Sequence, residues 1–366
     1  MRCSEPLSLV LPSVLLLLTF TPPFLSPAQR SAAPSCGADS PAPAGPRWHA
    51  PTAQHAILFS GRHSDFDFER MASVVAYFGG EEAADLFAVF NHGDEQRAAA
   101  EEVLAQFAAL PNAVAAELVS EPPGGGFPPA ALAAMPSFPF GVTDGPFVST
   151  RAWAHIFNSL AVVWRLMVCA EESAGGRRYV MVVRARADLR VSEDQPTVDL
   201  SEYAAGRHGL EERLDGLPAL EGIAHGDNMR TDLVAGQANP VDLGYSSLRR
   251  IPLFMPNAFN YGAYNDQLGF GTREAMAMYL NVMYAIEDTC GTAYGITFGP
   301  EGLLKGALIL QAARLPAVIA VHRINLDYCI NSGTNPCPGD VDPRCNDECK
   351  AAAVHLKTAV EVRGLP

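Results

Sequence analysis

YVMVVRARADLRV, residues 179–191, changes from an apolar run to a row of charges within one predicted strand. Side chains on a strand alternate between its two faces, so charges at every second position share one face and the apolar residues between them share the other. The apolar half predicts entry into a buried sheet, and the charges then emerge at the carboxyl end of the strand. The charged residues are Arg184, Arg186, Asp188 and Arg190.

This charged row is a candidate anion site. Ligands of open parallel sheets bind beyond the carboxyl ends of the strands, where the row lies. Arginines offer paired donors that suit phosphate, and a carboxylate between them is able to hold a divalent cation or a ribose hydroxyl. Arg184, Arg186 and Asp188 are therefore candidate ligands of a nucleotide diphosphate. The alternative is a strand that leaves the sheet with its charges in weak surface ion pairs.

Strands and helices alternate on both sides of this stretch. Apolar segments predict strands over 56–60, 84–92 and 317–326, and helical spacing or capping predicts helices over 66–79, 94–109, 149–173 and after Thr272. This order indicates an α/β domain with a mostly parallel sheet and helices on both faces. Residues 192–250 carry no pattern that assigns them.

Two other predicted strand ends carry candidate site residues. Gly61 permits close approach of the backbone to a ligand, and Arg62 is able to reach a phosphate or a base. His322, at the end of the last predicted strand, is a candidate metal ligand together with Asp188. The structural alternatives are a turn glycine and a core histidine.

Two acidic segments lie beside predicted helices. Asp266 is a candidate general base, flanked by Asn265 and Gln267 as candidate ligands of a hydroxyl-rich acceptor. The alternative is a loop whose polar side chains satisfy its own backbone. Asp65 and Asp67 form a literal D-x-D metal pattern, but they stand at a predicted helix start, where acids favour the helix dipole. We interpret them as helix-start residues.

The ends of the chain predict passage through the secretory pathway. Residues 1–28 resemble a signal peptide or an uncleaved signal anchor, and residues 29–54 a Pro/Ala/Ser-rich linker or stem. Cys329, Cys337, Cys345 and Cys349 predict a disulfide-stapled tail over 329–366, since their spacing lacks paired zinc knuckles. The folded domain then spans 55–328, in the Golgi lumen as a type II membrane protein or in a secreted protein.

Composition and motifs exclude several functions. A formal charge of −14 argues against general nucleic-acid binding, so any anionic ligand needs a local basic patch. The chain has no G-x-S-x-G elbow, no H-E-x-x-H, no P-loop, and no G-x-G-x-x-G after the first strand.

The order of short motifs resembles a diffuse group of glycosyltransferases that includes lipopolysaccharide-type transferases and uncharacterised algal and plant relatives. The motifs are FSGR, ADLFAVF, IFNSLAVVWRLMVCAEES, RYVMVVRARADLRV, NDQLGFGTREAMAMYLNVMYAI and GPEGLLKGALI, within residues 55–328. In that group a strand ends in an R-x-R-x-D-like motif, often with Pro where Ala187 stands. A later N-D-Q-F segment matches residues 265–276, with Leu268 in place of the aromatic residue.

The resemblance implies a Rossmann-related, GT-A-like domain that binds a nucleotide sugar. It implies that Asp188 binds a divalent cation, Mn²⁺ or Mg²⁺, that Arg184 and Arg186 flank the diphosphate, and that Asp266 lies near the acceptor. Because Arg186 stands where the first acid of a D-x-D would be, the arginines are able to neutralise the leaving diphosphate in place of a metal.

The expected function is transfer of a sugar from a nucleotide-sugar donor to a glycan or protein acceptor. The first alternative is a secreted or lumenal binding protein on the same fold without turnover. The second is a hydrolase that pairs Asp188 with Asp227 or Asp232, which requires two carboxyls about 5–10 Å apart. A shared location of Asp188, Arg186, Gly61 and Asp266 would favour the transferase.

Overall fold

The structure, a computed structural model, describes residues 50–120, 150–204, 230–234, 249–256, 264–282, 304–305, 307–308, 311, 317–324, 326 and 328–330. The predicted signal segment, nearly all of the linker and the tail beyond Ile330 lie outside these residues. The described helices include none that is long and apolar enough to cross a membrane.

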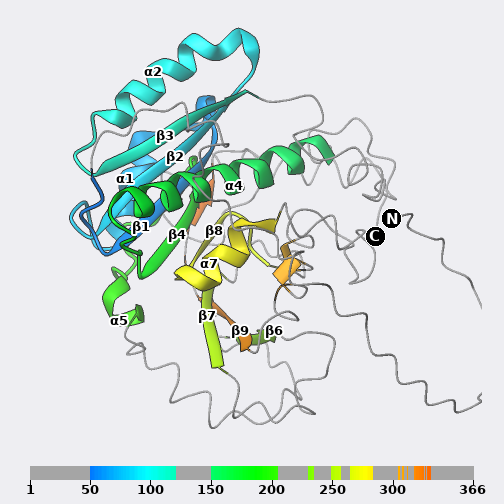
Figure 1. The fold of residues 1–366 in the computed structure, drawn as a ribbon. Helices are drawn as coiled ribbons and strands as arrows, with labels where there is room; N and C mark the ends of the chain where they lie inside the picture. Colours follow the sequence, from blue (N-terminus) through cyan, green and yellow to red (C-terminus); the bar gives the residue numbers. More distant parts are fainter. Residues whose placement is uncertain are drawn as a thin grey trace, which may run out of the picture.

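Eight of the described strands form one sheet in the order β3-β2-β1-β4-β8-β7-β9-β6 (Figure 1). The strands are β1 (His55–Arg62), β2 (Ala84–His92), β3 (Ala113–Ser120), β4 (Met181–Arg186), β6 (Arg230–Val234), β7 (Arg249–Pro256), β8 (Leu268–Thr272) and β9 (Ala317–Ile324). The half from β3 to β4 is parallel throughout, and β7 runs parallel to β9. β8 is antiparallel to both β4 and β7, and β6 is antiparallel to β9. The predicted α/β class is confirmed.

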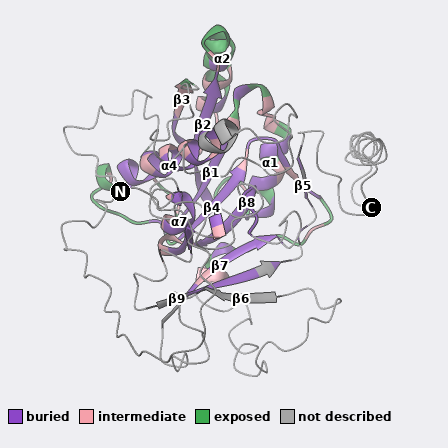
Figure 2. Cartoon of the chain, turned by 90° about the vertical axis from the view of Figure 1, so that its right-hand side faces the viewer, coloured by how far each residue is buried: buried purple, intermediate pink, exposed green. Residues whose placement is uncertain are grey.

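Helices cover both faces of the sheet (Figures 1 and 2). α1 (Phe68–Tyr77) and α2 (Arg97–Ala108) bury Met71, Val74 and Phe107 against one face. α4 (Thr150–Ser173) and α7 (Arg273–Leu280) bury Phe157, Trp164 and Tyr279 against the other. The short helix α5 (Leu200–Ala204) lies in the region that the sequence left unassigned, and 3-10 turns η2 (His63–Asp65) and η3 (Asp94–Gln96) precede α1 and α2.

Side-chain caps fix the starts of α1 and α7. The Asp67 carboxylate accepts the backbone N–H groups of Glu69 at 2.9 Å and Arg70 at 3.2 Å. This acid of the D-x-D therefore stands at the helix start, as predicted, and it also caps the helix. The Thr272 hydroxyl accepts the N–H of Ala275 at 3.3 Å, as its capping prediction requires.

The predicted strand over 179–191 is wrong in one respect, because the chain turns at Ala187 and Asp188. β4 ends at Arg186, and β5 (Leu189–Val191) leaves the sheet to pair antiparallel with β10 (Tyr328–Ile330). Two contacts fix the turn: the N–H of Ala187 donates to the carbonyl of Ser60 in the distant strand β1 at 3.3 Å, and Arg186 binds Asp188. The apolar side of the alternation persists through the turn and stays buried: Ala185, Ala187, Leu189 and Val191.

Four strands of the described sheet were not predicted. β6 lies in the region that the sequence left unassigned, β3 is rich in alanine without clear alternation, and β7 and β8 contain or adjoin the glycines and prolines that favour loops. In β8 the glycines have a packing function, because a Cβ on Gly271 would lie 2.7 Å from the carbonyl oxygen of Pro252 in β7. The Asn265–Gln267 turn is therefore followed by a strand, and only then by the capped helix.

A buried carboxylate anchors the start of the domain to the amino-terminal end of β2. Asp85 in β2 accepts the N–H groups of Thr52 and Ala53 at 2.9 and 3.2 Å and the Tyr179 hydroxyl at 2.8 Å. Burial, followed by the Asp85 charge, raises the pKa of Tyr179, so the phenol remains a donor. The chain therefore enters β1 from a fixed position.

We expect Asp85→Ala to lower the free energy of unfolding by about 3 kcal/mol, because it leaves four donors without their acceptor in a largely buried place. These donors are the N–H groups of Thr52 and Ala53 and the hydroxyls of Thr52 and Tyr179. Urea titration followed by circular dichroism measures this change. Glu101→Ala, which removes an exposed partner of Arg97, is the matched control and should cost less than about 1 kcal/mol. Equal losses in the two variants would refute the anchoring role of Asp85.

Candidate functional site

The candidate site lies where the carboxyl ends of β1 and β4 meet. β1 is followed along the chain by β2 and β3 on one side of it, and β4 then returns to pair on its other side. Such a reversal of strand order opens a crevice between the connections, and ligands of α/β sheets bind there. Ser60 of β1 pairs with Arg186 of β4, so the predicted residues of both strands lie at the same end of the sheet.

Arg186 and Asp188 form a two-point ion pair at this edge. Arg186 Nε lies 2.8 Å from Asp188 Oδ1, and Nη2 lies 2.8 Å from Oδ2. The Asp188 side chain is 3% exposed, whereas that of Arg186 is 25% exposed. Burial lowers the pKa of Arg186, but Asp188, with Asp266 and Asp65, outweighs burial and holds it above its ordinary value. Arg186 is thus a firmly charged group with a part of its surface open.

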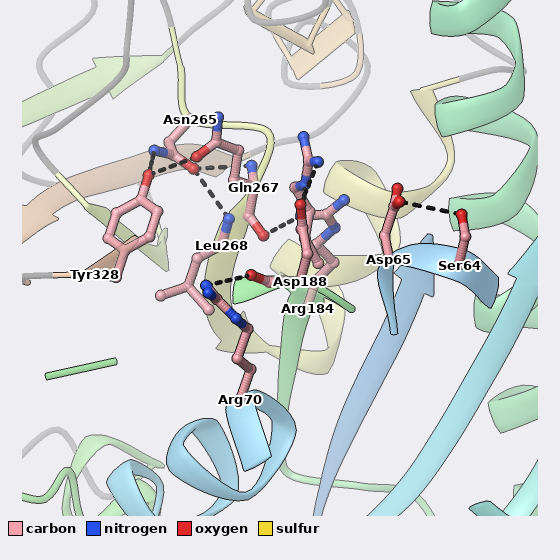
Figure 3. Close-up of polar contacts among 10 residues, drawn as sticks. Ser64, Asp65, Arg70, Arg184, Asp188, Asn265, Gln267, Leu268 and Tyr328 are labelled. Carbon is pink, nitrogen blue, oxygen red and sulfur yellow. Dashed lines mark hydrogen bonds and ion pairs between the residues drawn. The ribbon is translucent and has the colours of Figure 1, made fainter. Parts of the chain in front are cut away.

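Asp188 is held from the opposite side by α1. Arg70, which is buried, donates from Nη1 to the backbone carbonyl of Asp188 at 3.4 Å (Figure 3). The other acid of the D-x-D, Asp65, accepts a hydrogen bond from the Ser64 hydroxyl at 3.2 Å and lies within electrostatic range of Arg186. Asp65 therefore belongs to the site region, although Asp67 does not.

Arg184 stands two residues before Arg186 in β4 and is fully buried. Its Nη1 donates to the backbone carbonyl of Gln267, and its Nε has no hydrogen-bond partner in the described part of the chain. Burial lowers the pKa of Arg184, against the opposing effects of Tyr279 and Asp266. A buried guanidinium whose Nε donor is unpaired among the described residues contributes positive electrostatic potential to the site.

Asp266 joins the group from the turn that precedes β8. Its carboxyl is buried and lies within electrostatic range of Arg184, Arg186 and Asp188. Burial raises the pKa of Asp266, while the two arginines act in the opposite direction. A carboxyl with a raised pKa is a stronger base once it is ionised. The structure thus brings together Arg184, Arg186, Asp188 and Asp266 from two distant parts of the sequence.

The side chains of Asn265 and Gln267 are engaged within the protein. Asn265 Oδ1 accepts the N–H groups of Gln267 at 2.9 Å and Leu268 at 3.0 Å, and its Nδ2 donates to the Tyr328 hydroxyl at 2.6 Å. The same hydroxyl donates to Gln267 Oε1 at 3.0 Å. Acceptor binding by these two amides stays a prediction. Sequence reasoning missed Tyr328, because no motif surrounds it.

Gly61 and Arg62 lie at the end of β1. A Cβ on Gly61 would lie 3.0 Å from the Cβ of Ala187, so the close approach at this glycine is to the turn that carries Asp188. Arg62 is exposed beside it. Contact of either residue with a donor stays a prediction.

His322 and Asp232 lie far along the sheet from Asp188. Register pairs place His322 level with Val183, three strands from β4, which corresponds to about 14 Å. His322 is buried and stacks on Phe254, with ring centroids 4.9 Å apart. Asp232 lies in β6, four strands from β4, or about 19 Å, which is too far for a hydrolytic pair with Asp188. Asp227 lies outside the described residues.

The predicted divalent cation does not fit the side chains of this region. Both carboxylate oxygens of Asp188 bind Arg186, and the distance to His322 prevents the two residues from holding one ion. Within the described ranges, no three His, Cys, Asp or Glu residues are grouped so that they could hold a metal. We therefore derive no step through a metal.

No protein-family model and no curated protein matches this chain. Among solved structures, the mannosyltransferase Ktr4p from S. cerevisiae aligns over 84% of both chains with 12% identity and a TM-score of 0.32. An inositol-1-phosphate CTP transferase from T. maritima aligns over 83% of this chain and 98% of its own, with 7% identity and a TM-score of 0.24. A mannose-1-phosphate geranyltransferase from Thermus thermophilus aligns over 75% and 76%, with 12% identity and a TM-score of 0.25. At these scores the neighbours assign neither a family nor an activity to this chain.

We expect Gly61→Ala to destabilise the protein by about 1–3 kcal/mol, because the new methyl group meets the Cβ of Ala187. The double variant Gly61→Ala/Ala187→Gly should recover part of that loss by removing the opposing methyl group. Gly93→Ala is the control, since its nearest neighbour atom would lie 3.9 Å away. Urea unfolding checks all three, and absence of recovery in the double variant would contradict the contact.

Proposed function

We propose that this protein is a glycosyltransferase that moves a sugar from a nucleotide-sugar donor to a hydroxyl of a glycan or protein. The observation that carries the proposal is the grouping of Arg184, Arg186, Asp188 and Asp266 at the carboxyl ends of β1 and β4. Two of these residues carry positive charge suited to a diphosphate, and one is a buried carboxyl suited to base catalysis. They stand at the point of the sheet where ligands of α/β domains bind.

Arg186 is the residue that meets the donor diphosphate. It is the partly exposed arginine of the group, and two phosphate oxygens are able to accept a pair of parallel hydrogen bonds from it, as the Asp188 carboxylate does. Arg62, exposed at the end of β1, approaches the diphosphate from the other strand. The positive charge of Arg184 attracts the diphosphate without contact. When Arg186 exchanges the Asp188 carboxylate for the phosphate, Asp188 accepts a hydrogen bond from a ribose hydroxyl instead.

Asp266 serves as the base in an inverting transfer. The acceptor oxygen forms a bond to the anomeric carbon, and the bond from that carbon to the phosphate oxygen breaks. Its electron pair leaves with the nucleoside diphosphate, and the Asp266 carboxylate takes the acceptor proton. Arg184 and Arg186 stabilise the charge that develops on the leaving diphosphate, which is the task that a metal ion performs in other sites.

The secretory location is part of the proposal. It is supported by the apolar N-terminal segment, by the crowded cysteines after Cys329, and by Cys169 in α4, which is disulfide-bonded. Disulfides persist in the oxidising lumen and outside the cell.

A panel of nucleoside diphosphates, with and without Mn²⁺, tests donor binding by thermal shift. A ligand at 100-fold its Kd stabilises the native state by about 2.7 kcal/mol, so the matching nucleotide should raise Tm by about 5 °C. Arg186→Gln should lose most of that rise, whereas Arg97→Gln on exposed α2 should keep it. If no nucleotide raises the Tm of the wild type, the proposal is contradicted.

Asp266→Asn should bind the same nucleoside diphosphate as the wild type. It should cleave the matching nucleotide sugar to this diphosphate about 100-fold more slowly. Because burial raises the pKa of Asp266, wild-type turnover should fall in acid with a midpoint above about 4, the ordinary aspartate value. Initial rates between about pH 4 and 8 measure both effects. Nucleotide binding without turnover in the wild type would favour a binding protein, and full turnover by Asp266→Asn would remove Asp266 as the base.

A further inference from the structure

The Tyr328 hydroxyl connects the two residues that flank Asp266. It accepts from Asn265 Nδ2 at 2.6 Å and donates to Gln267 Oε1 at 3.0 Å, which uses both its donor and an acceptor position. All three side chains are buried, so neither amide is offered water as a substitute partner. Figure 3 shows the phenol reaching the turn from the side opposite to Arg184. Residues 265 and 267 are thereby tied to one fixed point.

The same residue belongs to the strand that holds the other half of the site. Tyr328 begins β10 and pairs with Val191 of β5, while Ile330 pairs with Leu189, the residue after Asp188. β10 therefore binds the Asp188 segment through its backbone and the Asp266 segment through the Tyr328 side chain. Arg184 closes the third side, because its guanidinium binds the carbonyl of Gln267.

A second tyrosine supports the turn from α7. The Tyr279 hydroxyl donates to the backbone carbonyl of Asn265 at 2.9 Å. The charged or titratable groups around the Asp266 carboxyl thus come from β4 and its turn (Arg184, Arg186, Asp188), from α7 (Tyr279) and from β10 (Tyr328). Burial raises the pKa of Tyr328, so its hydroxyl keeps its proton at every working pH.

We propose that Tyr328 is a positioning residue that sets the place of the Asp266 carboxyl relative to Arg186 and Asp188 by bridging Asn265 and Gln267. This inference rests on the proposed function for its catalytic meaning, because Asp266 is the base there. Loss of the bridge should slow the chemical step more than it weakens donor binding, since the donor contacts belong to β1 and β4. A displacement of about 1 Å at a catalytic group costs as much as 100-fold in rate.

Tyr328→Phe tests this role in the full-length protein, because it keeps the ring and the β5–β10 pairing and removes only the hydroxyl. The probe is the nucleotide sugar whose nucleoside diphosphate gives the largest thermal shift, with water as the acceptor. We expect kcat for release of the diphosphate to fall about 10- to 100-fold, with the donor KM changed less than about threefold. Tyr77→Phe, near the far end of α1, is the matched control and should change neither constant.

A second measurement does not depend on turnover. In protein carrying ¹³C-carboxyl aspartate, the Asp266 resonance, assigned by its loss in Asp266→Asn, should titrate at a lower midpoint in Tyr328→Phe. A freed turn admits water, which lessens the burial that raises the pKa of Asp266, so the midpoint should move toward the ordinary aspartate value. Tyr77→Phe should titrate as the wild type does.

The outcomes separate the inference from the proposed function. An unchanged Asp266 midpoint in Tyr328→Phe overturns the positioning role, as does a loss of turnover that merely follows the fraction of unfolded protein. If the wild type binds no nucleotide, the proposed function fails and the titration alone decides the role of Tyr328. Should Tyr328→Phe not fold, Gln267→Met removes the other end of the same hydrogen bond and is judged by the same two measurements.

Discussion

Arg186 and Asp188 stand two positions apart and bind each other through two nitrogens and two oxygens at 2.8 Å. This contact closes the turn that ends β4. It also pairs the positive charge of Arg186 with the negative charge of the buried Asp188 carboxylate. A buried charge without a partner is far more costly than a paired one, so the turn, the strand end and the charges depend on one another. Ser60 in β1 and Arg70 in α1 hold the same turn by hydrogen bonds to Ala187 and Asp188, and Gly61 leaves room for it.

Around this pair the structure assembles segments that are distant in the chain. The sheet places β4 between parallel β1, which ends in Gly61 and Arg62, and antiparallel β8, which is preceded by Asp266. β10 then ties both sides together through its pairing with β5 and through Tyr328. The site consequently forms where the parallel half of the sheet meets the antiparallel strand β8.

Several features could be predicted from local signals. Apolar runs predicted β1, β2 and β9, helical spacing predicted α1, and the capping residue Thr272 predicted the start of α7. The helices α2 and α4 were predicted as well. The charged row after Val183 correctly indicated a strand end with buried apolar residues on its other face. Predictions were weakest where tertiary contacts outweigh propensity, as in glycine-rich β8, alanine-rich β3 and the turn at Ala187.

The sequence by itself determined the α/β class, the alternation at 181–191 and the choice of the candidates Arg184, Arg186, Asp188 and Asp266. Periodicity and charge can be recognised within short segments of the chain, without knowledge of tertiary contacts. Only the tertiary structure decided which of them meet. Sheet order separates His322 from Asp188, although both were predicted near the carboxyl ends of strands, and a hydroxyl more than sixty residues away holds the Asp266 turn. Partner choice among buried polar groups depends on strand order and on contacts between distant segments, which local patterns along the chain do not reveal.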